Sequence, residues 1–266
     1  MTDRQWAKLE DIPQSKLTPM LRQYIEAKAQ SGDSLLFFRM GDFFELFFED
    51  AIDAAELIGL TLTSRDGAGK ENPIPMAGVP ARSVDGYVAR AIKAGRTVAL
   101  CDQVEDPKDA KGIVKRELVR TVTPGTVLEP DLLEERANNY LGALLCQNGL
   151  AGLALVDVTT GEFLTAQIHA LPEQALADEL TRTSPVEVLV SDGIESRTLE
   201  RFQERFDGIA FTLRPDHEFD PGHCAELLKG QFDIATLKGL GLEDAAQALA
   251  CAGAALSYIQ ETQRDA

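Results

Sequence analysis

Residues 37–48 read FFRMGDFFELFF, so six of the chain's twelve Phe residues surround a single Gly-Asp turn. Gly41 allows the backbone to turn sharply there because glycine has no Cβ atom. If the chain after the turn is extended, Phe43 and Glu45 point to the same side of it. An aromatic ring that can stack, placed beside a carboxylate that can accept a hydrogen bond, suits the recognition of an unstacked base.

The same residues also have a purely structural explanation. Asp42 would cap a following helix, Glu45 would complete a capping box three residues later, and Phe43 would be a core residue beside the cap. Phe44, Phe47, Phe48, Ala51, Ala55 and Ile58 recur every three to four residues. This spacing predicts an amphipathic helix that ends near Gly59. The spacing alone leaves both explanations open.

The surrounding sequence predicts an α/β domain with a mixed sheet. Helical periodicity marks residues 18–30 and 83–94, and apolar runs predict strands at 35–39, 60–63, 97–103 and 118–123. A polar loop is expected at 64–72, and residues 73–80, which contain three prolines, are expected to form a turn. Hydrophobic periodicity is lost between residues 124 and 139, which indicates a domain boundary.

The second half of the chain predicts another α/β unit. Strands are expected at 141–145, 153–158, 162–168, 186–190 and 209–213, and helices at 172–183 and 243–262. Thr159-Thr160-Gly161 is expected to close a hairpin. The predicted organisation is a first domain at 1–128, a linker at 129–139 and a second domain at 140–266. The chain stops directly after its last helix, from which we expect a fragment of a longer protein.

Composition indicates an ordinary globular protein without a membrane segment. Of the 266 residues, 44% are hydrophobic and 26% are charged. The N-terminus lacks the apolar run of a secretory signal, and the low-polarity stretch at 248–259 is too short to span a bilayer. The four cysteines are widely spaced and form no Cys-x-x-Cys pair, which favours reduced thiols and a cytoplasmic location.

Charge is distributed unevenly along the chain. The net charge of −17, taken by itself, argues against binding to nucleic acid. Residues 1–130, however, carry 17 Lys and Arg against 20 Asp and Glu, whereas residues 131–266 carry 9 against 23. Basic residues of the first half that could meet phosphates, or simply form a solvated face, are Arg65, Lys70, Arg82, Lys108, Lys111, Lys115, Arg116 and Arg120.

Signals for catalysis or metal binding are weak. Gly67-Ala-Gly69-Lys70 resembles the end of a phosphate-binding loop, but Ser64 replaces the first required Gly and Glu71 replaces the final Ser or Thr. His217, His223 and Cys224 lack a second cluster that would complete a zinc site. Asp157, placed in the first strand of a ribonuclease-H-like sheet, could hold a catalytic metal, but no spacing nominates partner carboxylates. We therefore expect no metal or cofactor in this chain.

Four motifs, in order, carry a resemblance to a known family. They are FFRMGDFFE at 37–45, PIPMAG at 73–78, CDQVEDP at 101–107 and RTVTPGT at 120–126. Together they resemble the N-terminal domain of MutS, the bacterial DNA mismatch-recognition family. LVDVTTGE at 155–162 and AGAALSY at 252–258 are similar to the connector domain and the lever entry of that family.

The resemblance implies a mismatch-recognition domain followed by a ribonuclease-H-like connector without nuclease activity. Phe43 would wedge into the minor groove at a mispair or small loop, and Glu45 would hydrogen-bond to the mispaired base. Further contacts with the DNA backbone or groove are expected from Arg39, Met40, Asp42, Arg65, Met76, Lys108 and Lys111. The connector would contact MutL. Dimerisation, ATP and Mg²⁺ would belong to family regions absent from this chain, which would be a cytoplasmic, nucleoid-associated binding module.

Two alternatives remain from the sequence. One is a metal-dependent nuclease built around Asp157. The other is a protein-interaction scaffold without appreciable DNA affinity of its own.

Overall fold

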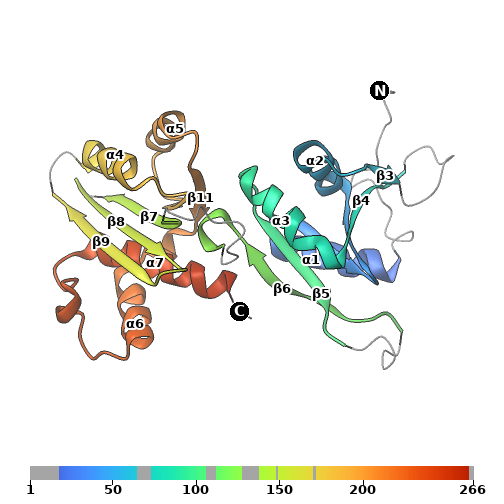
Figure 1. Cartoon of the computed structure of the whole chain (residues 1–266). Helices are drawn as coiled ribbons and strands as arrows, with labels where there is room; N and C mark the ends of the chain where they lie inside the picture. Colours follow the sequence, from blue (N-terminus) through green and yellow to red (C-terminus); the bar gives the residue numbers. More distant parts are fainter. Residues whose placement is uncertain are drawn as a thin grey trace. The chain divides into compact units, whose positions relative to one another are not determined.

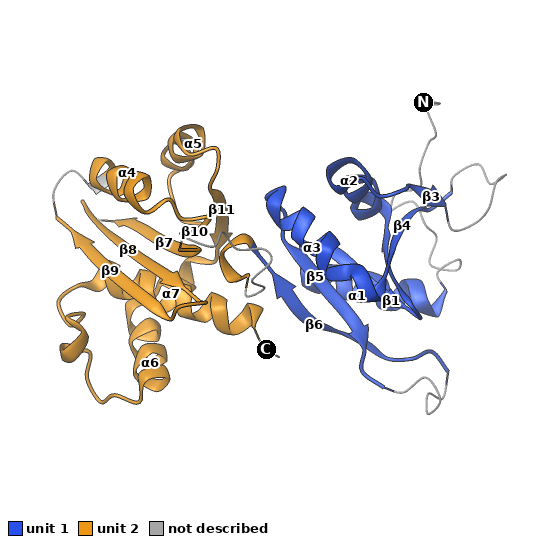
Figure 2. Ribbon diagram, viewed as in Figure 1, with its two compact units in different colours: residues 1–123, 264–266 blue, residues 124–263 orange. Residues whose placement is uncertain are grey.

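The computed structural model describes residues 18–64, 73–105, 112–127, 138–147, 149–169 and 172–263. Arg65, Lys70, Lys108 and Lys111 lie outside these residues. The chain forms two compact units, residues 1–123 with 264–266 and residues 124–263 (Figure 2). Each unit has its own sheet and its own core. Within the described part of the chain, no helix is long and apolar enough to cross a membrane.

The described residues of unit 1 form a six-stranded mixed sheet with three α-helices. In chain order the elements are α1 Pro19–Ser31, β1 Leu35–Met40, β2 Phe43–Phe47, α2 Phe48–Ile58, β3 Thr63–Ser64, β4 Pro75–Pro80, α3 Val84–Lys93, β5 Val98–Gln103 and β6 Arg116–Val122. The strand order is β3-β4-β2-β1-β5-β6. β1 and β5 are parallel, and the other neighbouring pairs are antiparallel. This confirms the expected α/β class with a mixed sheet.

Helix α1 packs on one face of this sheet. Its side chains Met20, Leu21, Tyr24 and Ala27 share a core with Leu36 and Phe38 of β1 and Phe47 of β2. The helix begins after Thr18, whose hydroxyl accepts a hydrogen bond from the Leu21 amide at 3.3 Å.

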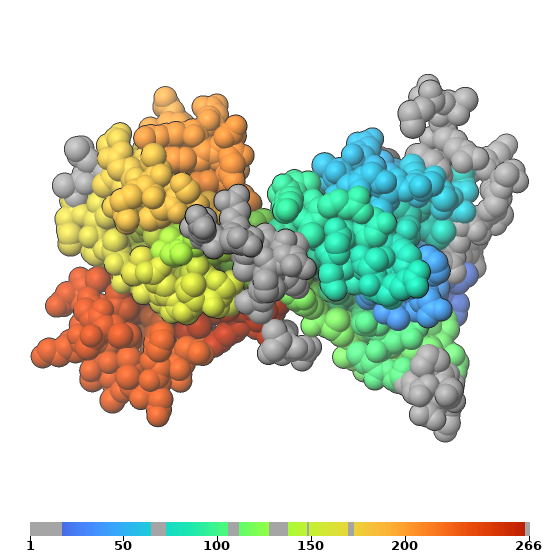
Figure 3. Space-filling model, in the orientation of Figure 1, coloured from blue at the N-terminus to red at the C-terminus, as the bar shows by residue number. Residues whose placement is uncertain are grey.

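The alternate residues of the same strands, such as Phe37, Phe44 and Leu46, are buried against the other face. Helix α2 contacts β2 and β4, and α3 contacts β4 and β5. In Figure 3, α3 forms much of the surface of unit 1 that is turned toward the viewer. α1 therefore packs on one face of the sheet, part of which stays exposed, and the α2–α3 pair packs on the other.

A buried polar network fixes the start of α2. Asp50 is 4% exposed and accepts hydrogen bonds from the Lys28 ammonium at 2.8 Å, the Leu36 amide at 3.1 Å and the Tyr24 hydroxyl at 3.2 Å. Burial raises the pKa of the Asp50 carboxyl, and the Lys28 charge partly opposes this effect. The network joins α1, β1 and α2, so it sets where the chain leaves β2.

The helix predicted over Phe44–Ile58 is wrong in its first turn. Residues Phe43–Phe47 form strand β2, paired on both sides with β1 and β4, and α2 begins only at Phe48. Asp42 and Glu45 therefore form no capping box, and α2 has no side-chain N-cap at all. Two ladders of backbone hydrogen bonds outweigh the local helical spacing, because propensity is a weak preference that tertiary pairing overrides.

The turn predicted over residues 73–80 is also wrong in part. Pro75–Pro80 is strand β4, which pairs with both β2 and β3. Proline is tolerated because Pro75 and Pro80 stand at the two ends of the strand, where a missing amide donor costs least. The strand expected at 60–63 is reduced to the two residues of β3. The remaining elements of this unit confirm the prediction within a few residues.

In the described part of unit 2, a five-stranded mixed sheet is accompanied by four α-helices. Its elements are β7 Tyr140–Gln147, β8 Leu150–Asp157, β9 Glu162–Ile168, α4 Pro172–Thr183, β10 Glu187–Ser191, α5 Ser196–Arg205, β11 Ala210–Arg214, α6 Pro221–Phe232 and α7 Ala246–Thr262. The strand order is β11-β10-β7-β8-β9, in which β7, β8 and β9 are antiparallel neighbours and β10 runs parallel to β7 and β11. This is the expected ribonuclease-H-like arrangement.

Helices cover both faces of the second sheet (Figure 1). Leu176, Leu180 and Phe202 from α4 and α5 share one core with the sheet, and α6 and α7 form the other. α5 and α6 were not predicted from the sequence. The predicted hairpin at Thr159–Gly161 is confirmed, with Gly161 at φ +75°. α7 packs so closely on β8 that a Cβ atom at Gly152 would lie 2.2 Å from the backbone of Gln247.

Candidate nucleic-acid interface

Strand β2 presents two side chains on one incompletely covered face of the first sheet. Phe43 is 48% exposed and Glu45 is partly exposed, whereas Phe44 between them is 3% exposed. The alternation follows from the two-residue period of an extended strand. The segment is therefore extended, and Phe43 and Glu45 point to the same side of it, as expected for an extended chain.

The sheet register defines the neighbours of this pair. Phe43 lies between Met40 of β1 and Pro80 of β4, and Glu45 lies between Phe38 and Gly78. We call Met40, Phe43, Glu45, Gly78 and Pro80 the β2 face. β2 is an inner strand with partners on both sides, so the backbone under Phe43 is held by hydrogen bonds and only the side chains are offered to a ligand.

The turn before Phe43 is held by Arg39. Gly41 has φ +59°, and the Arg39 Nε donates a hydrogen bond to its carbonyl at 2.5 Å. The Arg39 guanidinium lies 5.2 Å from the centre of the Phe44 ring and 3.8 Å from the Asp102 carboxylate. Because Arg39 pairs with Phe44 in the ladder, its side chain starts on the sheet face opposite Phe43. It supports the turn from behind.

The other predicted contact residues are distributed as follows. Met40 lies next to Phe43 on the β2 face, and both Met40 and Met76 pack at the edge of the core under α1. Asp42 is exposed in the turn, and its carbonyl accepts a hydrogen bond from the Ala81 amide at 2.8 Å. Arg65, Lys108 and Lys111 are outside the described residues. The structure therefore brings Phe43, Glu45 and Met40 together, with Met76 beside them.

Arg116, part of the predicted basic segment, is engaged inside unit 1. Its guanidinium donates to the carbonyls of Arg39 at 2.6 Å and Val114 at 2.8 Å, and lies 5.2 Å from the centre of the Phe38 ring. Burial lowers the pKa of this side chain. It stabilises the end of β1 from the α1 side of the sheet.

Asp157 is the last residue of β8, the second strand of its unit rather than the first. The residue is 1% exposed, and its carboxylate accepts hydrogen bonds from the amides of Thr159 at 2.9 Å and Asn139 at 3.2 Å. Burial disfavours the charge, but these bonds and those from the Thr159 hydroxyl and the Thr160 amide lower the pKa overall. Asp157 thereby organises the hairpin that follows it.

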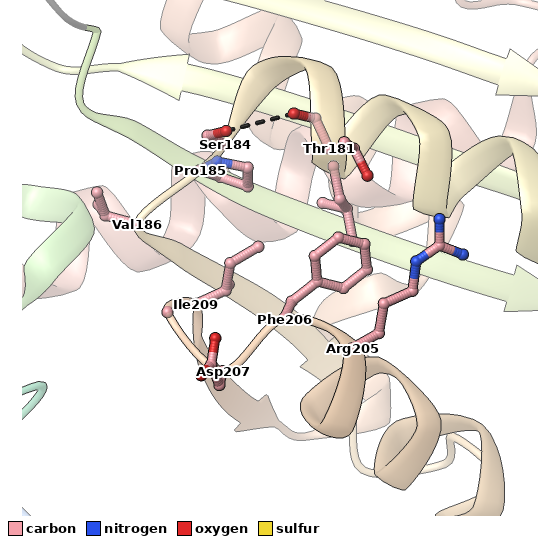
Figure 4. Close-up of a pocket in the computed structure, with 10 residues that line it drawn as sticks. Thr181, Ser184, Pro185, Val186, Arg205, Phe206, Asp207 and Ile209 are labelled. Atoms are coloured by element: carbon pink, nitrogen blue, oxygen red, sulfur yellow. Dashed lines mark hydrogen bonds between the residues drawn. The ribbon is translucent and has the colours of Figure 1, made fainter.

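No group of three His, Cys, Asp or Glu side chains suited to a metal ion occurs among the described residues. A hollow of about 580 Å³ opens in unit 2 where α4 and α5 end. Its lining includes Thr181, Ser184, Val186, Phe206 and Ile209 (Figure 4). These residues belong to unit 2, so the hollow is not built from the predicted contact residues of unit 1.

Comparison with known families accounts for both units. Residues 18–131 match the family described as MutS domain I, and residues 139–266 match MutS domain II. The chain belongs to the MutS family. Domain I contains the β2 face, and domain II contains the five-stranded sheet of unit 2.

Two relatives are named DNA mismatch repair protein MutS. The one from Desulforapulum autotrophicum is 43% identical over 93% of this chain, and the one from Symbiobacterium thermophilum is 41% identical over 94%. The match covers 28% and 29% of those relatives, so this chain spans less than a third of their length.

Among solved structures, a similar chain is the T. thermophilus RuvC in complex with a Holliday junction substrate. The two sequences are 16% identical. The structural match covers 46% of this chain and 96% of the RuvC chain, with a TM-score of 0.31. A score this low does not establish a common fold.

Proposed function

We propose that this MutS-family chain recognises mispaired or looped duplex DNA in mismatch repair, with Phe43 entering the minor groove at the defect. The observation that carries the proposal is the exposure of Phe43 beside Glu45 on a strand whose other aromatic residues are buried. A large aromatic side chain held by a rigid inner strand pays little conformational entropy when it stacks, because its backbone is already fixed.

Energetics make such a wedge selective for defects. Separating two stacked base pairs costs a few kcal/mol, and less where pairing is already defective. Stacking of a base on an aromatic ring returns about 1–3 kcal/mol. Phe43 can therefore insert where the duplex deforms easily and not elsewhere, so it reads deformability rather than sequence.

Glu45 adds a second source of discrimination between matched and mispaired DNA. It projects from the same face two residues beyond Phe43, so it can reach a base that is displaced by the ring. A carboxylate near DNA is repelled by phosphates, and only a hydrogen bond from a base edge freed by mispairing compensates for this repulsion. Glu45 thus disfavours matched DNA and accepts a bond at a mispair.

We propose further contacts with the DNA backbone and groove. Arg82 is exposed and follows Pro80, a member of the β2 face, by two residues. Arg65, Lys108 and Lys111 are proposed to meet phosphates, and Met40, Met76 and Asp42 to line the groove; Arg39 acts through the turn that it holds. Unit 1 carries 18 Lys and Arg against 20 Asp and Glu, so its net charge is close to neutral and its basic side chains can still attract phosphates locally.

Unit 2 is proposed to serve protein contacts. Residues 124–263 carry 8 Lys and Arg against 23 Asp and Glu, a balance that repels DNA and suits a protein partner, which we propose to be MutL. We infer a binding module that holds no cofactor. ATP, Mg²⁺ and the main dimer contacts are assigned to other regions of the longer relatives, and the site of action to the cytoplasmic nucleoid.

The nuclease alternative is less well supported. Asp157 is committed to hydrogen bonds within its own hairpin, and its burial leaves little access for a metal and a phosphate. Incubation with Mg²⁺ or Mn²⁺ and labelled duplex tests it, since cleavage that is lost in Asp157→Asn would favour the nuclease.

The test of the main proposal compares binding of a duplex with one central G·T mismatch and its matched counterpart by fluorescence anisotropy. Phe43→Ala should remove the preference for the mismatch. Leu57→Ala, which truncates another exposed apolar side chain on α2, should keep it. A preference that survives in Phe43→Ala would contradict the site assignment, and no preference in the unmodified chain would favour the scaffold alternative.

The same comparison can be made in a chimaera, in which this chain replaces the matching segment of the Desulforapulum autotrophicum relative. There the proposal requires a mismatch preference that depends on Phe43. Its absence in a folded chimaera would contradict the proposed function outright.

A further inference from the structure

Gly78 lies opposite Glu45 in the ladder between β2 and β4. The two flanking residues on the same face of β4, Met76 and Pro80, are partly exposed, whereas Ala77 and Val79 on the opposite face are buried. Gly78 itself is exposed. The strand next to Glu45 therefore has a gap in its row of side chains, on the face that presents Phe43.

Neither backbone conformation nor packing requires glycine at this position. Gly78 does not have the positive φ of Gly41 or Gly59. An added Cβ atom would lie 3.5 Å from the Phe44 carbonyl oxygen and 3.6 Å from the Glu45 Cγ, which is ordinary van der Waals contact. By comparison, a Cβ at Gly152 or Gly253 would come within 2.2 Å of neighbouring atoms.

Glycine inside a strand weakens the strand, because it costs backbone entropy and packs no side chain. A strand glycine with no conformational or packing reason is typical of a place where a ligand approaches the backbone closely. Any larger side chain here would rise beside the Glu45 side chain, in the space through which a base edge must reach the carboxylate. The gap at Gly78 keeps that approach open.

We propose that Gly78 is a specificity-determining residue, whose missing side chain admits the sugar and base edge of the mispaired nucleotide to Glu45. This inference rests on the proposed function and adds a steric condition to it. Phe43 separates the stacked base pairs, and Glu45 accepts the hydrogen bond from the displaced base. Gly78, on β4 beside Glu45, leaves room for that nucleotide.

The test uses Gly78→Ala and Gly78→Val in the full chain, with the G·T and matched duplexes. Gly78→Val should lower mismatch affinity by about tenfold or more and reduce the mismatch preference, and Gly78→Ala should have a smaller effect in the same direction. The Tm of both variants should equal or exceed that of the unmodified chain, since alanine and valine cost less backbone entropy than glycine, and valine favours strands.

Gly86→Ala is the matched control. Gly86 is exposed on α3, on the other side of the sheet, and an added Cβ would meet no atom within 4 Å, so this variant should bind like the unmodified chain. If Gly78→Val unfolds the chain, Gly78→Ala decides, because its single methyl makes only ordinary contacts.

Phe43→Ala in the same series separates the two proposals. If Phe43→Ala loses the mismatch preference while both folded Gly78 variants retain full affinity, the inference about Gly78 is wrong and the proposed function stands. If Phe43→Ala keeps the preference, the proposed function itself fails.

Discussion

Phe43 and Phe44 are consecutive residues that lie on opposite faces of strand β2, the first 48% exposed and the second 3% exposed. One ring is therefore offered to a ligand while its neighbour is part of the core. The arrangement is rigid, because β2 is paired on both sides by β1 and β4. Substitutions at the two positions should separate binding from stability.

Phe44→Ala should lower the free energy of unfolding by about 3 kcal/mol or more, because it leaves a cavity under α2 and removes the ring beneath Arg39. Phe43→Ala should change it by less than about 1 kcal/mol. Urea denaturation monitored by circular dichroism measures both values. A similar loss of stability in the two variants would mean that Phe43 is a core residue.

Glu45→Gln should raise the affinity for matched duplex by up to about fivefold, because removal of the carboxylate charge relieves repulsion from phosphates worth about 1 kcal/mol. Mismatch binding should rise less, so the preference should fall. Glu49→Gln makes the same charge change at an exposed position of α2 and serves as control. If the two variants gained equally for matched DNA, Glu45 would act only through net charge.

Asp157 should make unfolding of unit 2 sensitive to acid. Its hydrogen bonds lower the pKa of the folded carboxyl, so its stabilising contribution is present above the unfolded value of about 3.9 and is lost as the pH falls through the lower folded value. The stability difference between the unmodified chain and Asp157→Asn should be constant from pH 7 to about 5 and shrink below about 4. If this stability difference instead grew as the pH was lowered, the pKa of the folded Asp157 carboxyl would not be lowered.

Gly253→Ala should destabilise unit 2 by about 1–3 kcal/mol, since the new Cβ would lie 2.2 Å from the Cβ of Cys224, where α7 packs on α6. Gly230→Ala on α6 has open space around it and should be neutral or stabilising by about 0.5–1 kcal/mol. Thermal denaturation of the two variants compares them directly. Equal effects would show that helix propensity, rather than close packing, determines the result.

The fold was predictable where signals are local and strong. α1 has helical apolar spacing, and the hairpin between β8 and β9 has a glycine at its turn, so both elements could be placed from the sequence. β2 and β4 were not, because the same Phe residues satisfy a helical period and prolines bound β4. These two strands form because they pair with each other, although they are far apart along the chain. A local sequence pattern carries no information about such pairing.

The candidate site was predictable to a similar extent. That Phe43 and Glu45 share a face follows from the two-residue period once the strand is known. Gly78 belongs to the PIPMAG motif at 73–78, but its position opposite Glu45 depends on the register between β2 and β4. Arg39 was expected near DNA, whereas its side chain holds the Gly41 carbonyl on the other face, a contact that depends on the turn geometry.

The most direct measurement is photo-cross-linking from position 43. A benzophenone-bearing phenylalanine analogue is placed at Phe43, or at Leu57 as an exposed control on α2, and the chain is irradiated with duplex that carries one G·T mismatch. The analogue at position 43 should cross-link to the mispaired nucleotides, and the analogue at position 57 should not. Cross-links from position 43 that are spread along the duplex, or no stronger than those from position 57, would contradict the claim that Phe43 enters the DNA at the mispair.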